Sequence, residues 1–146
     1  MSQGIHILYV DDEPDISSIA CMALQDLGGY LVTACSSGQL ALEHLAKTTF
    51  NLMIIDVMMP GLSGIETIQR ARSRGLELPP FAFITAKVGT EQRQHYFDLG
   101  CVGVIAKPFD PMAISKIVKS ILEAPQSQSE FTSSRVNSEQ KGKIPR

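Results

Sequence analysis

The sequence predicts an α/β domain in which helices cover both faces of one parallel β-sheet. Five short apolar runs of strand length recur along the chain, at residues 5–10, 30–34, 52–55, 81–84 and 102–106. All but the second are nearly continuous in apolar character, which is typical of strands buried on both sides. Segments with helical periodicity separate the runs, and this regular alternation favours a parallel sheet with right-handed crossovers.

The first helix is expected to begin at Pro14, because proline suits the first helical turn, and to end at Gly28 and Gly29, which can adopt a left-handed cap. Its apolar residues have the three-and-four spacing of a single buried stripe. That stripe consists of Ile16, Ile19, Ala20, Ala23, Leu24 and Leu27.

Three more helices are expected between the later strands. One covers residues 37–47, and Ser63 with Glu66 has the pattern of a capping box that begins the next. The segment near 90–99 has the poorest helical periodicity of all. The inward-facing residues of the helix at 37–47 are expected to be Leu40, Ala41 and Leu45.

The last helix has a clear start signal and a clear apolar face. Asp110 is a good N-cap and Pro111 fits the first helical position. The apolar stripe that follows predicts a helix packed on the sheet. It consists of Ile114, Ile117, Val118, Ile121 and Leu122.

One globular domain is expected over residues 1–124. Beyond it the composition changes to Pro, Gln, Ser, Asn, Glu and Lys, with too few large apolar groups to offset the entropy of ordering. Residues 125–146 are therefore interpreted as a disordered tail or linker, with a partner-binding segment as the alternative. If the chain is a piece of a longer protein, an output domain would lie beyond this linker.

Charge and cysteine content narrow the class of protein. With 13 basic and 15 acidic residues the formal charge is -2, so we expect no binding of nucleic acid or membrane by this chain. The three cysteines are widely spaced in apolar surroundings, which suits reduced thiols better than a disulfide framework or a zinc site. No signal peptide and no apolar run near the roughly 20 residues of a membrane span can be recognised, so a cytoplasmic location is expected.

Polar side chains able to do chemistry follow four of the five apolar runs. Asp11 and Asp12 follow the first, Asp56 the third, Thr85 the fourth and Lys107 the fifth. Because the carboxyl ends of parallel strands lie together at one edge, where ligands bind, these residues are expected to meet. Each alone could be a helix cap or an ordinary loop residue. Their joint placement is what favours a functional site.

The chemistry of these groups suits phosphoryl transfer to a carboxylate. Three carboxylates at close range repel one another unless a cation compensates them. Oxygen ligands without a nearby histidine or cysteine favour Mg²⁺ over zinc, with Mn²⁺ as a possible substitute. Lys107 can pair with a phosphoryl oxygen and Thr85 can donate a hydrogen bond to one, which completes such a site.

Four motifs contain these residues: VDDE at 10–13, DVMMPG at 56–61, TA at 85–86 and KPF at 107–109. In this combination and order they closely resemble the receiver domains of two-component response regulators, over residues 4–123. The resemblance implies a flavodoxin-like (βα)5 doubly wound sheet of strand order 2-1-3-4-5. It also implies a phosphorelay switch that receives its phosphoryl group from a histidine kinase or phosphotransfer protein and then controls a downstream protein.

The resemblance further implies roles for the acidic residues. Asp56 looks like the phosphoacceptor. Asp12 would ligate Mg²⁺ directly, together with Asp56 and the backbone carbonyl of Met58, whereas Asp11 would hold the ion mainly through water. Such a domain is not a conventional enzyme, because it catalyses only its own phosphorylation and dephosphorylation.

The same resemblance implies how the signal is read. Lys107 would contact the phosphoryl group and Thr85 would move toward it, and the peptide bond between Lys107 and Pro108 is expected to be cis. An aromatic residue three positions before the lysine commonly reports this change in the family. Here that position is Val104, so the usual aromatic side chain is absent.

Met58 and Lys87 occupy two positions that can tune how long the phosphoryl group survives, and both are bulky here. Our hypothesis is that they hinder the attacking water and make the aspartyl phosphate comparatively long-lived. The residues argue against two other functions. A phosphohydrolase of the haloacid dehalogenase type needs a second Asp where Met58 stands, and an interaction module that is not phosphorylated would not need the intact acidic set.

Overall fold

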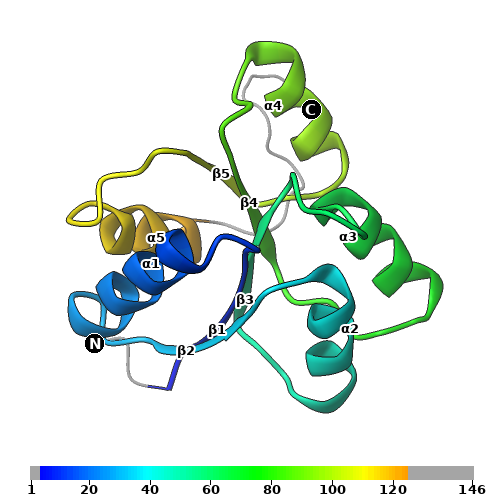
Figure 1. The fold of residues 1–146 in the computed structure, drawn as a ribbon, viewed down its shortest axis with the longest axis horizontal. Coiled ribbons are helices and arrows are strands. Elements are labelled where there is room, and N and C mark those ends of the chain that lie inside the picture. The colour runs from blue at the N-terminus through cyan, green and yellow to red at the C-terminus, as the bar shows by residue number, and fades with distance from the viewer. Residues whose placement is uncertain (1–3, 125–146) are drawn as a thin grey trace.

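The computed structural model describes residues 4–124 and shows one parallel sheet between two layers of helices (Figure 1). The five strands lie in the order β2-β1-β3-β4-β5, as the resemblance implied. They are β1 (His6–Val10), β2 (Leu31–Cys35), β3 (Leu52–Asp56), β4 (Phe81–Thr85) and β5 (Gly103–Ala106). The helices are α1 (Pro14–Asp26), α2 (Gly38–Lys47), α3 (Gly64–Ser73), α4 (Thr90–Asp98) and α5 (Ile114–Glu123).

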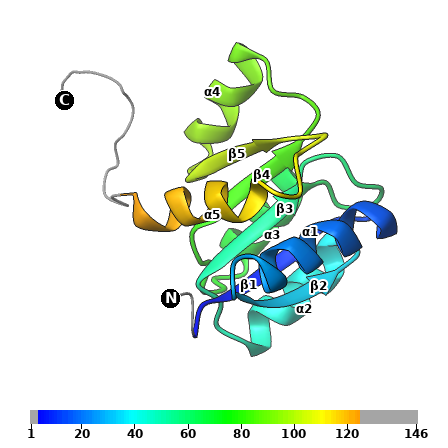
Figure 2. The same ribbon diagram turned by 90° about the vertical axis from the view of Figure 1, so that its left-hand side faces the viewer.

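The helices divide between the two faces of the sheet, and α1 lies beside α5 (Figure 2). The core on that side combines Ile7, Leu52 and Ile54 with apolar residues of α1 and α5. The other core combines Leu8 and Met53 with residues of α2, α3 and α4. Side chains that alternate along β1 and β3 thus enter opposite cores, which explains why these strands are apolar throughout.

The buried stripes of α1 and α2 are narrower than their sequence periodicity predicted. Ile19 and Leu27 of the α1 segment are exposed, as is Leu40 of α2. Leu42 is buried instead, beside Ala41 and Leu45. A helix that packs on a sheet buries only the side chains directed at it, so apolar residues at the margins of the stripe stay in contact with water.

The predicted start of α5 at Asp110 and Pro111 is wrong by three residues. Asp110 accepts a hydrogen bond from the Met112 amide at 2.9 Å and its carbonyl accepts from the Ala113 amide at 2.9 Å. These bonds form a turn, and the regular helix begins only at Ile114. The aspartate therefore caps a turn that precedes the helix.

The capping box that begins α3 is confirmed, and it sets the approach of this helix to β3. Ser63 accepts a hydrogen bond from the Glu66 amide at 3.0 Å, and Glu66 accepts one from the Ser63 amide at 2.9 Å. Gly64 then donates its amide to the carbonyl of Val57 at 3.0 Å. The first turn of α3 thus lies directly against the backbone that carries Asp56.

The cysteines are free thiols, with Cys101 buried and Cys21 and Cys35 partly buried. Burial raises the pKa of Cys101 to about 12 and that of Cys35 to about 11. In residues 4–124 no helix combines the length and the apolar character that a membrane span requires. The tail or linker expected at 125–146 lies outside the described residues.

Gly64→Ala should destabilise the fold by about 1–3 kcal/mol, because overpacking against a backbone cannot be relieved by a rotamer change. A Cβ on Gly64 would lie 3.0 Å from the carbonyl carbon of Asp56 and 3.1 Å from the Cα of Val57. Urea unfolding measures the difference, with Ser18→Ala on the exposed side of α1 as a control expected to change stability by about 0.5 kcal/mol or less. Equal stabilities of the two variants would contradict this account.

Candidate functional site

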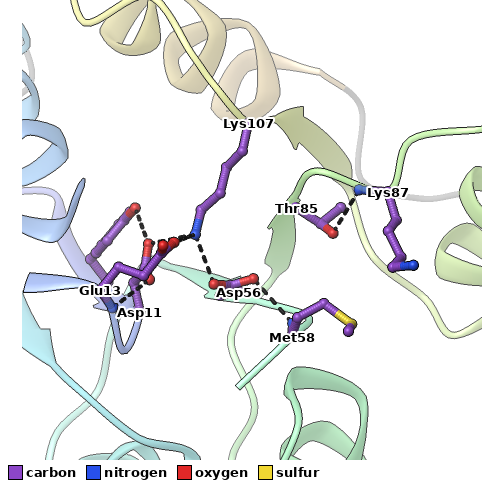
Figure 3. Close-up of polar contacts among 8 residues, drawn as sticks. Asp11, Glu13, Asp56, Met58, Thr85, Lys87 and Lys107 are labelled. Atoms are coloured by element: carbon purple, nitrogen blue, oxygen red, sulfur yellow. Dashed lines mark hydrogen bonds and ion pairs between the residues drawn. The ribbon is translucent and has the colours of Figure 1, made fainter. Parts of the chain in front are cut away.

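The residues that the sequence singled out meet at the carboxyl edge of the sheet (Figure 3). Asp56 and Thr85 are the last residues of β3 and β4. The sequence placed them directly after these strands, so each strand is one residue longer at its carboxyl end than predicted. Asp11 directly follows β1 and Lys107 directly follows β5. The parallel register of the strands therefore brings together side chains that are up to about a hundred positions apart in the sequence.

Asp11, Asp12 and Asp56 form a compact acidic cluster. One carboxylate oxygen from each lies within 4.8 Å of the others, and Asp11 and Asp56 are buried. Carboxylates this close repel one another, and burial increases the cost because water cannot screen them. The cluster requires positive charge nearby.

Lys107 supplies that charge within the described residues. Its Nζ lies 2.8 Å from Asp56 Oδ2, 3.1 Å from Asp11 Oδ2 and 2.7 Å from Glu13 Oε1. Only 12% of the lysine side chain is exposed. Burial alone would lower the pKa of Lys107, but the hydrogen bonds to Asp56, Glu13 and Asp11 outweigh it and raise the pKa, so the ammonium stays charged.

Asp56 is oriented by one hydrogen bond at each carboxylate oxygen. Lys107 donates to Oδ2 at 2.8 Å, and the backbone amide of Met58 donates to Oδ1 at 3.1 Å. Burial raises the pKa of Asp56, while Lys107 and the Met58 amide act in the opposite direction. A carboxylate fixed beside an ammonium is the arrangement that a nucleophile for phosphoryl transfer needs.

Two residues that the sequence did not single out hold this constellation. Tyr9 is fully buried and donates its hydroxyl to Asp11 Oδ2 at 3.0 Å, and the amide of Glu13 donates to Asp11 Oδ1 at 3.0 Å. Burial, followed by the charge of Asp11, raises the pKa of Tyr9, so the phenol remains a donor. The sequence did contain a signal for Tyr9, because residues two apart on a strand lie on the same side of the sheet.

Thr85 is fully buried and is engaged away from the acidic cluster. Its Oγ1 accepts a hydrogen bond from the amide of Lys87 at 3.0 Å. Figure 3 shows this pair on the side of Asp56 that faces away from Asp11 and Glu13. Among residues 4–124, no hydrogen bond joins Thr85 to Asp56. Thr85 therefore has to change its contacts to act on a group attached to Asp56.

The donor set of the cluster fits a hard divalent cation. Asp11, Asp12 and Asp56 offer only carboxylate oxygens at compatible spacing. The exposed Glu13 and the partly exposed Asp12 leave the cluster open to solvent on one side, so water could complete a coordination shell. Four carboxylates face one ammonium here, and the excess of negative charge favours binding of a cation.

Comparisons with known proteins agree with this geometry. Residues 7–119 match the family model described as the response regulator receiver domain. The chain is 31% identical over 131 residues to the response regulator Rre1 of Synechocystis sp., covering 89% of this chain and 57% of that protein. It is 37% identical over 106 residues to the response regulator SaeR of Staphylococcus epidermidis, covering 73% of this chain and 45% of that protein. The chain spans about half the length of these curated relatives.

Solved structures show the same fold. The chemotaxis protein CheY4 of Vibrio cholerae superimposes with a TM-score of 0.72 at 30% sequence identity, covering 80% of this chain and 98% of that one. The BeF3-activated DrrB receiver domain has a TM-score of 0.69 at 26% identity and covers 82% of this chain and 98% of its own. Receiver domains are phosphorylated on an aspartate in two-component signalling and act as switches, not as enzymes with a separate substrate. The fold, the acidic site with its lysine and the family match together show that this chain belongs to the response regulator receiver domain family.

Proposed function

We propose that Asp56 accepts a phosphoryl group from a phosphohistidine of a histidine kinase or phosphotransfer protein. The observation that carries this proposal is the geometry of its carboxylate, which is fixed between the Lys107 ammonium and the Met58 amide beside two further aspartates. The side chain of Asp11 is fully buried and its oxygens are bonded by Tyr9, the Glu13 amide and Lys107, whereas 5% of the Asp56 side chain is exposed. Asp56 is the better candidate for the nucleophile because its carboxylate is held in a fixed position and keeps a small exposed area.

The transfer itself needs little from the protein beyond position and charge. An oxygen of Asp56 forms a bond to phosphorus while the bond from phosphorus to the histidine nitrogen of the donor breaks, and the donor nitrogen keeps the electron pair. Lys107 then exchanges its contact with Asp56 for a phosphoryl oxygen, since its ammonium lies 2.8 Å from the acceptor carboxylate. Thr85 leaves Lys87 and donates its hydroxyl to another phosphoryl oxygen.

We assign the metal site to Asp12, Asp56 and the backbone carbonyl of Met58, with Asp11 acting through water. The Asp11 side chain is fully buried and is hydrogen-bonded to Tyr9 and the Glu13 amide, which supports its indirect role. Mg²⁺ is the expected ion, with Mn²⁺ as a possible substitute. When bound, the ion neutralises charge on the transferred group and on the carboxylates around it.

The domain assignment extends this proposal. Residues 1–124 would act as the receiver domain and 125–146 as a tail or linker. The phosphorylated domain would control a downstream protein through a changed surface around α4, β5 and α5. We place this activity in the cytoplasm and expect no binding of nucleic acid or membrane by this chain, in keeping with its formal charge of -2.

Intact-mass measurement after incubation with acetyl phosphate and Mg²⁺ tests the proposal. Wild-type protein should gain one phosphoryl group, whereas Asp56→Asn should gain none because the nucleophilic oxygen is lost. Asp26→Asn, which changes an exposed acid at the end of α1, serves as the matched control and should react as the wild type does. A chelator should abolish the gain in every variant. Phosphorylation of Asp56→Asn at the wild-type rate would contradict the assignment of the acceptor.

Substitutions at the exposed residues Met58 and Lys87 should shorten the lifetime of the aspartyl phosphate. Met58 is 58% exposed and Lys87 is exposed too, and both lie on the side of Asp56 that faces away from Asp11 (Figure 3). We expect the aspartyl phosphate of Met58→Asn and of Lys87→Glu to be hydrolysed faster than that of the wild type. The reason is that a smaller or acidic side chain admits and orients the attacking water. Mass spectrometry after removal of the donor measures this decay.

The controls for that experiment make the same chemical changes far from the site. Met22→Asn and Lys116→Glu alter exposed residues of α1 and α5 and should decay as the wild type does. Unchanged decay in both Met58→Asn and Lys87→Glu would show that these side chains do not shield the phosphoryl group.

A further inference from the structure

The proposed phosphorylation of Asp56, on which this inference rests, has to be communicated from the site to α4. The residue three positions before Lys107 is Val104, which pairs in register with Phe83 of β4. Val104 is partly buried and packs against the core that contains Phe83 and Tyr96. The strand position that would carry an aromatic ring is therefore small, and an aromatic ring comes to the same region from α4 instead.

Tyr96 is that ring, and it anchors α4. It is 3% exposed, whereas every other residue of α4 is exposed. Its ring lies against Phe83, with the ring centroids 5.2 Å apart and the planes inclined at 52°. Because α4 has a single buried side chain, its attachment to the sheet depends on this residue more than that of any other helix depends on one residue.

The hydroxyl of Tyr96 is bonded to the loop that holds Thr85. It donates to the backbone carbonyl of Lys87 at 2.9 Å, and the backbone amide of the same Lys87 donates to Thr85 Oγ1 at 3.0 Å. One residue thus joins the switch threonine to the buried side chain of α4. If Thr85 moves toward Asp56, the Lys87 amide loses Thr85 Oγ1 as its hydrogen-bond acceptor, and Lys87 is then free to move.

We infer that Tyr96 is a positioning residue that, through Lys87, holds Thr85 turned away from Asp56 until the phosphoryl group is present. When Thr85 leaves Lys87, the bond from Tyr96 to the Lys87 carbonyl breaks and α4 loses its tether to the loop. A purely structural tyrosine would contribute the same packing against Phe83 without responding to the occupant of Asp56. The hydroxyl distinguishes the two roles, since packing needs only the ring.

Tyr96→Phe separates these roles because it keeps the ring and removes the hydrogen bond. Beryllofluoride with Mg²⁺ can stand in for the phosphoryl group, and its affinity should rise by roughly two- to tenfold in Tyr96→Phe, the range of one net hydrogen bond that no longer opposes the change. Tyr30→Phe is the matched control, since Tyr30 is also buried but belongs to the core on the other face of the sheet. Its affinity should equal that of the wild type.

A second measurement uses wild-type protein and does not depend on any variant. The chain has three tyrosines, so labelling the ring Cζ carbon gives three NMR signals, and Tyr96→Phe identifies which belongs to Tyr96. We expect this signal to shift on addition of beryllofluoride and Mg²⁺. A Tyr96 signal that stays in place while beryllofluoride binds, or an unchanged affinity in Tyr96→Phe, would overturn the inference alone. Failure of wild-type protein to bind beryllofluoride would overturn the proposed function together with it.

Discussion

The ion pairs of Lys107 are the constraint on which the rest of the site depends. The sheet collects four carboxylates at one edge, and Lys107 is the cation that contacts three of them. Strand β4 lies between β5 and β3, so only a long side chain that follows β5 can reach the acidic cluster. The lysine offsets part of the repulsion among these carboxylates, and it leaves an excess of negative charge that a divalent cation can neutralise. The repulsion among these carboxylates therefore affects both the stability of the site and its ability to bind a cation.

Two groups of residues around Asp56 have different roles in the switch. Lys107 and the aspartates supply charge around Asp56, whereas Thr85 and Lys87, which lie on the side away from Asp11 and Glu13, connect the site to α4 (Figure 3). Strands β3 and β4, which carry Asp56 and Thr85, are buried at every position. The α4 helix has Tyr96 as its single buried side chain, whereas each of the other helices has at least three. Changes at the site are thus expected to move this helix before they disturb the core.

Much of this could be predicted from the sequence because the relevant signals are local. Apolar runs marked all five strands, and polar residues at their ends marked Asp11, Asp56 and Lys107. The strand order came from the resemblance of the motifs, since periodicity alone does not order strands. Tyr9 and Tyr96 were not recognised, because a buried tyrosine in an apolar segment looks like a packing residue until the partner of its hydroxyl is known. The exposed Leu40 and the late start of α5 depend on tertiary packing and on turn geometry, which patterns do not encode.

Magnesium-dependent stability tests the central electrostatic claim most directly. Unfolding of the wild type should be measured with MgCl₂ and with NaCl at equal ionic strength. At about 100 times the dissociation constant, Mg²⁺ should add about 2.7 kcal/mol to the free energy of unfolding, and Asp12→Asn should lose most of this gain. A wild type that responds equally to the two salts, or an Asp12→Asn variant that responds as the wild type does, would contradict the claim that this cluster is a cation site.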